Sequence, residues 1–241
     1  MALLLLHLNT RLNKPDIRVI IPAFNEQNAV ALVVEEIPKA LVSEVIVVDN
    51  GSNDNTFEKA KNAGATALKE ARRGYGQACL KGMDHIAQSS SQPDIVVFLD
   101  GDHSDYPSQM SDLTDPIINN NIDLVIGSRA LGQKERGSMT PQQIFGNWLA
   151  TSLIKLFYNV SYTDLGPFRA VKYSSLLAID MKDTNYGWTV EMQLKAAKLN
   201  MKTLDVPVDY RQRIGVSKVS GTLKGTIMAG YKILFTIFRY L

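Results

Sequence analysis

The stretch from Ile95 to Pro107, IVVFLDGDHSDYP, constrains the fold most strongly, because an apolar run ends abruptly in a cluster of acidic residues. Such a run is typical of a strand that is buried on both faces of a parallel sheet. Ligands of open α/β sheets bind beyond the carboxyl ends of these strands. Asp100 and Asp102 flank the small Gly101, so one turn can direct both carboxylates toward a hard divalent cation. The stretch therefore predicts a strand that ends in a metal site, although a solvated acidic turn has the same pattern.

Short apolar runs alternate with amphipathic segments along most of the chain. We expect strands at 17–21, 44–48, 65–68, 95–99, 123–127 and 202–208, with a further short strand after the turn at 163–170. We expect helices at 25–37, 54–63, 76–87, 107–119, 141–158, 188–199 and 223–241. The aromatic side chains of the helix at 141–158 are interpreted as core residues. This alternation predicts a mostly parallel sheet in a three-layer α/β domain.

Composition narrows the class of protein. Cys79 is the single cysteine, so no intramolecular disulfide can form, which fits a reducing compartment such as the cytoplasm. The apolar patch at 3–8 is too short for a secretory signal, and no uninterrupted apolar stretch is long enough to predict a transmembrane helix. From Tyr210 onward the charged residues are all basic, namely Arg211, Arg213, Lys218, Lys224, Lys232 and Arg239. A basic tail on an acidic body indicates contact with a phosphate group or a membrane surface, and no nucleic-acid partner is expected.

The segment ARRGYGQA, residues 71–78, places Arg72 and Arg73 before a flexible Gly-x-Gly that begins a helix. Backbone amides at a helix N-terminus, together with arginine side chains, are suited to a diphosphate. The third glycine of a dinucleotide fingerprint is missing, and the chain has no P-loop sequence. These absences argue against a Rossmann dehydrogenase and against a P-loop kinase.

Eight short strings together resemble the GT-A glycosyltransferases of family 2, and within it the dolichyl- or polyprenyl-phosphate sugar synthases. The strings are IPAFNE (21–26), VVDNGSNDNT (47–56), RRGYGQA (72–78), FLDGDHSDYP (98–107), GSR (127–129), TDLGPFRA (163–170), YGWTVEM (186–192) and RIGVSK (213–218). They occur in the order of the family. The resemblance implies a three-layer GT-A (Rossmann-like) fold over residues 1–210. It implies that 211–241 form a basic segment on the acceptor side, followed by an amphipathic helix.

The resemblance also implies a site for a nucleoside diphosphate sugar. Asp100 and Asp102 match the metal-binding Asp-x-Asp of the family, which holds Mg²⁺ or Mn²⁺ against the donor diphosphate, and His103 is a weaker candidate for a third ligand. The residues expected to contact the donor are Pro22, Ala23, Asn25, Glu26, Asp49, Gly51, Arg72, Arg73, Gly76, Gly101 and Arg129.

The acceptor side offers two chemistries. A phosphate monoester is largely dianionic at neutral pH, so it needs positive charge more than it needs a base. The basic segment supplies Arg213, Ser217 and Lys218, and the turn before it in the chain adds Asp164 and Arg169. In TDLGPFRA, Pro167 departs from the family's Gly-Phe-Arg pattern. A hydroxyl acceptor would instead require a carboxylate base, for which Glu191 is the candidate.

The sequence thus predicts an inverting glycosyltransferase that acts on polyprenyl or dolichyl phosphate. The expected catalytic residues are Asp100, Asp102, Glu191, Arg213 and Lys218. A transferase to a soluble or glycan hydroxyl, with Glu191 as base, is the alternative within the enzyme class. A non-catalytic nucleotide-sugar binding protein and a nucleotidyltransferase are more remote alternatives. The C-terminal helix is expected to contact either the cytoplasmic face of a membrane or, in a homodimer, a second subunit.

Overall fold

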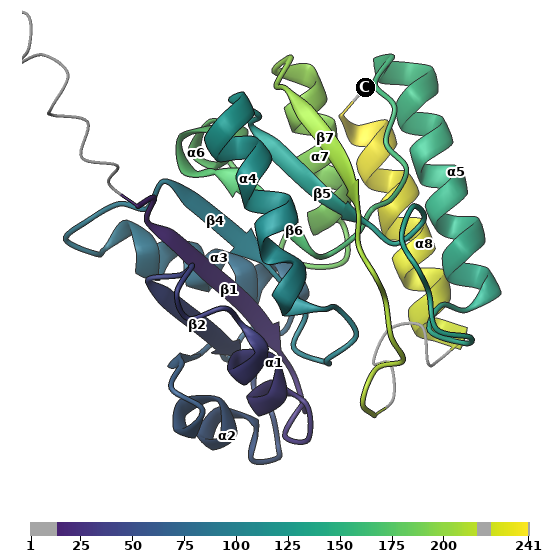
Figure 1. The fold of residues 1–241 in the computed structure, drawn as a ribbon. Helices are drawn as coiled ribbons and strands as arrows, with labels where there is room; N and C mark the ends of the chain where they lie inside the picture. Colours follow the sequence, from purple (N-terminus) through teal and green to yellow (C-terminus); the bar gives the residue numbers. More distant parts are fainter. Residues whose placement is uncertain (1–13, 216–222, 241) are drawn as a thin grey trace, which may run out of the picture.

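A seven-stranded, mostly parallel sheet forms the centre of the computed structural model, which describes residues 14–215 and 223–240 (Figure 1). The strand order is β3-β2-β1-β4-β6-β5-β7. Only β6 runs antiparallel to its neighbours in this described sheet. The strands are β1 (Ile17–Ala23), β2 (Glu44–Asp49), β3 (Thr66–Lys69), β4 (Ile95–Phe98), β5 (Leu124–Ser128), β6 (Arg169–Lys172) and β7 (Thr203–Pro207).

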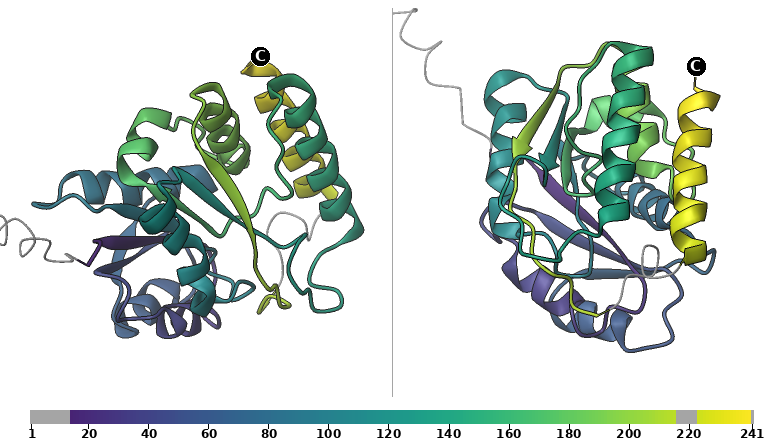
Figure 2. Two further views of the ribbon diagram at one scale, coloured as in Figure 1. Left: turned by 45° about the horizontal axis from the view of Figure 1, so that its top comes forward. Right: turned by 90° about the vertical axis from the view of Figure 1, so that its right-hand side faces the viewer.

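Helices cover both faces of the sheet, which confirms the predicted three-layer α/β fold (Figure 2). They are α1 (Val30–Glu36), α2 (Thr56–Asn62), α3 (Tyr75–Ala87), α4 (Met110–Asn120), α5 (Pro141–Tyr158), α6 (Tyr173–Ile179), α7 (Trp188–Lys198) and α8 (Leu223–Arg239). A short 3₁₀ turn, Pro107–Gln109, precedes α4. The core on one face includes side chains of α1, α2 and α4, and the core on the other includes side chains of α3, α5, α6, α7 and α8.

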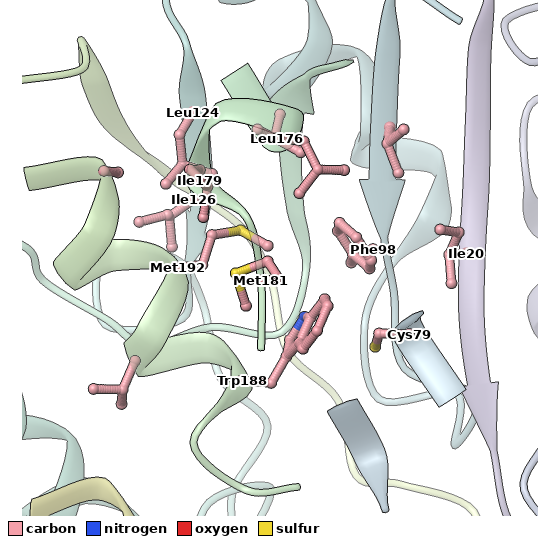
Figure 3. Close-up of a cluster of buried hydrophobic side chains, with 14 of the residues drawn as sticks. Ile20, Cys79, Phe98, Leu124, Ile126, Leu176, Ile179, Met181, Trp188 and Met192 are labelled. Atoms are coloured by element: carbon pink, nitrogen blue, oxygen red, sulfur yellow. The ribbon is translucent and has the colours of Figure 1, made fainter. Parts of the chain in front are cut away.

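Adjacent strand residues contribute to opposite cores because side chains alternate along a strand. Val97 packs toward α1 and α4, whereas its neighbour Phe98 packs toward α3 and α7. The Phe98 and Trp188 rings meet edge to face, with their centroids 5.7 Å apart, and the buried Cys79 belongs to the same core (Figure 3). Strands that are apolar on both faces therefore sit in the middle layer, as the apolar runs predict.

The first helix begins later than the sequence pattern predicts. Asn25 has a left-handed backbone with φ of 53°, and its amide donates a hydrogen bond to the Ser52 hydroxyl (2.9 Å). The amide of Glu26 donates to the Thr56 hydroxyl (2.8 Å). These amides bind the loop after β2 and a left-handed residue interrupts the turn, so α1 starts only at Val30. The short α6 was absent from the sequence-based assignment.

Helix α5 was predicted to bury its aromatic residues, and this was wrong. Phe145 and Trp148 are each 60% exposed, whereas Ala150 and Ile154 face the core. Helix α8 packs beside α5 (Figure 2), and Phe157 of α5 meets Phe238 of α8 with ring centroids 5.9 Å apart. Both helices carry exposed apolar side chains, which we call the aromatic face: Phe145, Trp148, Leu156, Phe157, Tyr231, Phe235 and Phe238.

Candidate active site

A cavity of about 550 Å³ lies where the carboxyl ends of β1, β4 and β5 face α5, α7 and α8. Segments far apart in the sequence line it, including Pro22, Ala23, Phe24, Glu26, Asn50, Arg73, Gly74, Asp100, Gly101, Asp102, Arg129, Gln143, Asn147, Tyr186, Trp188, Tyr210, Arg213 and Ile233. Parallel strands bring their carboxyl ends to one edge of the sheet, which is where ligands of such folds bind. The volume suits a ligand of nucleotide size.

Asp100 and Asp102, the candidate metal ligands, both line this cavity. The Tyr75 hydroxyl donates a hydrogen bond to Asp100 Oδ1 (3.0 Å), and Arg213 Nη2 lies 2.9 Å from Asp102 Oδ2. Burial, followed by the negative charge of Asp102, raises the pKa of Asp100 to about 6. A cation between the two carboxylates would relieve that repulsion. The donor set therefore fits a hard divalent metal.

Within residues 14–215 and 223–240, no group of three acidic, histidine or cysteine side chains is arranged to hold a metal ion. A site with only two protein carboxylates fits Mg²⁺ or a similar ion that completes its coordination with substrate phosphates and water. His103 does not join the pair: its Nε2 lies 2.8 Å from Glu36 Oε1 on α1, and its ring does not line the cavity. This geometry contradicts His103 as a metal ligand.

The loops after β1 and β2 form one wall of the cavity, and Asn50, which follows β2, links this wall to the segment 72–74 after β3. Its amide nitrogen donates to the Arg72 carbonyl (2.7 Å), and its Oδ1 accepts from the Gly74 amide (2.7 Å). Pro22, Ala23 and Glu26, three of the candidate donor contacts, line the cavity. Asn25, Asp49 and Gly51 do not line it: Asn25 Oδ1 accepts from the Asn53 amide, Asp49 Oδ1 accepts from the Ser52 amide, and Gly51 turns with φ of 72°. These three residues shape the loop.

The predicted diphosphate segment divides into residues with different tasks. Arg73 lines the cavity, with its guanidinium 3.8 Å from the centroid of the Phe24 ring. Arg72 points to solvent and pairs with Glu70 at 3.2 Å, so the structure places it outside the cavity. Gly76 does not line the cavity either. A Cβ there would lie 2.0 Å from the Asp183 carbonyl oxygen, so glycine is required for close packing.

Arg129 and Asp164 form a buried two-pronged ion pair. The Nε and Nη2 atoms of Arg129 lie 2.8 and 2.7 Å from the carboxylate oxygens of Asp164, which also accepts the Arg129 amide. Burial alone would lower the pKa of Arg129, but the Asp164 carboxylate outweighs this effect and raises it. Arg129 lines the cavity, while Asp164 is fully buried behind it. Asp164 thus orients Arg129 and is not positioned to contact an acceptor.

Arg169 was assigned to the acceptor, and the structure contradicts this. The side chain is fully buried, and its guanidinium donates to the carbonyls of Leu165, Gly166 and Thr189. Burial lowers the pKa of Arg169 to about 10. Because its guanidinium donates to these backbone carbonyls, Arg169 holds the turn at 165–169 against α7. Pro167, the residue that departs from the family pattern, lines the cavity on the outer side of this turn.

Glu191 was the candidate base, and the structure contradicts this as well. Its buried carboxylate accepts hydrogen bonds from the Asp183 amide (2.6 Å) and the Tyr240 hydroxyl (2.6 Å), and it pairs with Lys195 Nζ (2.7 Å). Burial would raise the pKa of Glu191, but these partners outweigh it and lower the pKa. Glu191 does not line the cavity. A carboxylate held in this way is unsuited to deprotonating an acceptor.

A model of the family described as glycosyl transferase family 2 matches residues 18–178. The chain belongs to this family. The matched range contains both carboxylates of the candidate metal site and ends within α6. The recognition and the GT-A fold that the sequence motifs predict are thereby confirmed.

Relatives of this family 2 member span most of its length. Glycosyltransferase AglJ of Haloferax volcanii is 30% identical over 197 residues, covering 81% of this chain and 63% of that protein. The undecaprenyl-phosphate mannosyltransferase of Micrococcus luteus is 28% identical over 218 residues, covering 86% of this chain and 88% of that protein. Glucosyl-3-phosphoglycerate synthase of Mycobacterium tuberculosis, solved with Mn²⁺, UDP and phosphoglyceric acid, shares the fold with a TM-score of 0.72 at 20% identity. That match covers 94% of this chain and 78% of the synthase.

Several cavity residues of this family 2 enzyme were missed by the sequence analysis. Tyr75 holds Asp100, Phe24 stacks under Arg73, and Tyr210 lies under Arg129 with its centroid 5.1 Å from the guanidinium carbon. Phe24 stands inside the string IPAFNE and Tyr75 inside RRGYGQA, so their proximity to charged residues is a sequence signal for them. No sequence signal marks Tyr210. Arg213, a candidate for the acceptor phosphate, lines the cavity, whereas Ser217 and Lys218 lie outside the described residues.

Proposed function

We propose that this family 2 glycosyltransferase transfers a sugar, with inversion, from a nucleoside diphosphate sugar to a polyprenyl or dolichyl phosphate. One observation carries the proposal: the acidic pair and a basic residue meet in one cavity, with Arg213 2.9 Å from Asp102. An acidic pair is suited to a metal-bound diphosphate, and an adjacent arginine is suited to a second phosphate.

Residues on the β1, β2 and α3 side of the cavity would receive the donor. Glu26, Arg73 and Phe24 line this side, and the Phe24 ring adds a flat apolar surface there. Asp100 and Asp102 would hold Mg²⁺ or Mn²⁺, which neutralises the charge that builds on the leaving nucleoside diphosphate. The similar M. tuberculosis synthase was solved with Mn²⁺ and UDP, which supports this choice of donor and metal.

The acceptor assignment rests on which charges line the cavity. Its described acidic lining consists of Glu26, Asp100 and Asp102, while Glu191 is buried elsewhere. The alternative with a hydroxyl acceptor therefore lacks its candidate base, because Glu191 does not line the cavity. A phosphate acceptor needs no base, because its second proton is largely lost at neutral pH. Arg213 supplies positive charge, and a relative that covers most of the chain is named as an undecaprenyl-phosphate mannosyltransferase.

The first prediction concerns substrates. We expect one UDP- or GDP-sugar, with Mn²⁺, to raise the melting temperature by mass action, and that sugar to be transferred to a short-chain polyprenyl phosphate. Thermal-shift scans and a radiolabelled transfer assay measure the two effects. Transfer to phosphoglyceric acid or to a glycan hydroxyl, but not to polyprenyl phosphate, would contradict the acceptor. Pyrophosphate release from a nucleoside triphosphate and a sugar phosphate would indicate a nucleotidyltransferase instead.

We further propose that the aromatic face contacts the cytoplasmic surface of a membrane. None of the helices in residues 14–215 and 223–240 is both long and apolar enough to span a bilayer. Trp148 and Tyr231 are more than half exposed, and aromatic side chains of this kind favour the membrane interface. Helices α5 and α8 carry lysine and arginine but no acidic residue. Anionic lipid would therefore be attracted to this surface.

The second prediction tests this contact. Trp148→Glu is expected to weaken binding to phosphatidylglycerol vesicles by about tenfold or more, because inserting one large side chain contributes about 1.5–3 kcal/mol. Vesicle sedimentation measures the change. Leu177→Glu is the matched control, since Leu177 is 55% exposed on α6, outside the aromatic face. Equal loss in both variants would contradict the proposal. A lipid-independent dimer that only Trp148→Glu dissociates would instead assign the face to a second copy.

A further inference from the structure

The segment from Met181 to Gly187 connects the two sides of the cavity. On one side it meets α3: the Gln77 amide donates to the Thr184 carbonyl (2.9 Å), and Gly76 lies directly against the Asp183 carbonyl. Next to these contacts, Asn185 and Tyr186 line the cavity. The first turn of α3 therefore packs against this segment. That turn lies on the proposed donor side of the cavity.

On its other side the same segment is fastened to α8. The Asp183 carboxylate pairs through Oδ2 with Lys232 Nζ (3.0 Å), while its Oδ1 accepts the amides of Asn185 and Gly187. The Asp183 carboxylate is buried, because its side chain is only 7% exposed. Glu191 provides the second contact, because it accepts both the Asp183 amide and the Tyr240 hydroxyl. A path thus runs by hydrogen bonds from Tyr240 to Glu191 and on to the Asp183 amide, then along the backbone to the Thr184 carbonyl, which accepts the Gln77 amide.

We infer that Glu191 and Asp183 are positioning residues. Through their contacts, the position of α8 influences the geometry of the nucleotide side of the cavity. Gly230 and Ile233 of α8 themselves line the cavity, so a shift of α8 would alter the cavity both directly and through this segment. A coupling between the two sides would be reciprocal, so that a change at either side alters binding at the other by the same factor. The inference rests on the proposed function for the assignment of the α3 side of the cavity to the nucleotide. The mechanical link itself does not depend on the acceptor.

The third prediction uses the two tyrosines of the C-terminal segment. Tyr240→Phe is expected to weaken binding of UDP or GDP, each with Mn²⁺, by about fivefold, a typical coupling between linked sites. Tyr231→Phe is the matched control, because the Tyr231 side chain is exposed and stacks on Phe235. Glu191→Gln is expected to weaken nucleotide binding at least as much as Tyr240→Phe does. The variant that combines both changes is expected to bind no more weakly than Glu191→Gln alone, because both changes break the same link. Titration calorimetry measures these affinities.

Hydrogen exchange supplies a readout that a local structural role would not move. In Tyr240→Phe, the Gln77 amide on α3 is expected to exchange faster, since its acceptor belongs to the released segment. Unchanged Gln77 exchange together with unchanged nucleotide affinity would overturn the inference, even if the melting temperature fell. Loss of turnover in Glu191→Gln with full turnover in Tyr240→Phe would overturn it too and would restore Glu191 as a base. Failure to use polyprenyl phosphate would contradict only the proposed acceptor, because neither measurement contains an acceptor.

Discussion

Replacing Asp102 with asparagine is expected to lower glycosyl transfer by about 100- to 1000-fold. Asparagine has nearly the same shape and can still accept the hydrogen bond from the Ser104 amide, but it removes the charge that pairs with Arg213 and would hold the metal. A metal that stabilises the leaving group contributes several kcal/mol, at about 1.36 kcal/mol for each factor of ten in rate. Initial rates across a Mn²⁺ titration measure the loss.

Asp112→Asn is the matched control for this substitution, because Asp112 is an exposed carboxylate on α4 outside the cavity. We expect it to retain normal transfer and a normal response to Mn²⁺. Chelation with EDTA is expected to stop the wild-type enzyme and to have little further effect on Asp102→Asn. If Asp102→Asn keeps most of its activity and its metal response, the acidic pair does not bind the metal, and the proposed role of the cavity fails.

Replacing Asp164 with alanine is expected to destabilise the protein by about 3–5 kcal/mol. Removing one member of a buried ion pair leaves the other charge uncompensated. Asp164 is fully buried, and Arg129, whose side chain is 12% exposed, would remain in the cavity wall with no carboxylate to hold its guanidinium. Urea unfolding followed by circular dichroism measures the change in the free energy of unfolding.

Two further variants separate the charge effect from general damage. Arg129→Met combined with Asp164→Leu should recover much of the stability that Asp164→Ala loses, because no buried charge remains unpaired. It should not recover transfer, because Arg129 lines the cavity. Asp180→Asn removes the charge of an exposed pair with Lys182 and keeps a residue that tolerates the left-handed backbone there (φ 51°), so it is expected to leave the urea midpoint nearly unchanged. Equal losses in Asp164→Ala and Asp180→Asn would contradict the role given to the buried pair.

The sequence was most informative where a residue's position follows from its own strand. The apolar run at 95–98 becomes β4, and Asp100 and Asp102 follow it into the cavity. A strand that is apolar on both faces lies in the middle layer of a parallel sheet. Recognising the strand therefore also predicts where its carboxyl end lies. Pro22, Ala23, Glu26 and Arg129, which the family resemblance implies as donor contacts, line the same cavity.

The sequence was least informative where a charged residue could face either inward or outward. Glu191 and Arg169 stand in strings that the family shares, but both side chains are buried among hydrogen-bond partners that come from distant segments. Helix periodicity also failed on α5, because an apolar residue on a helix can face a core or a free surface, and only the neighbouring α8 decides which.

The sequence by itself determined the alternating α/β order, the strand ends and the acidic pair, because these depend on local patterns of apolar and polar residues. Only the tertiary structure decided which charges face the cavity. Hydrogen bonds that close over long separations, such as Tyr240 to Glu191, Arg213 to Asp102 and Arg129 to Asp164, depend on how the helices pack. Because of that packing, Glu191, the predicted base, is buried among hydrogen-bond partners, whereas the Asp102–Arg213 pair lies in the cavity.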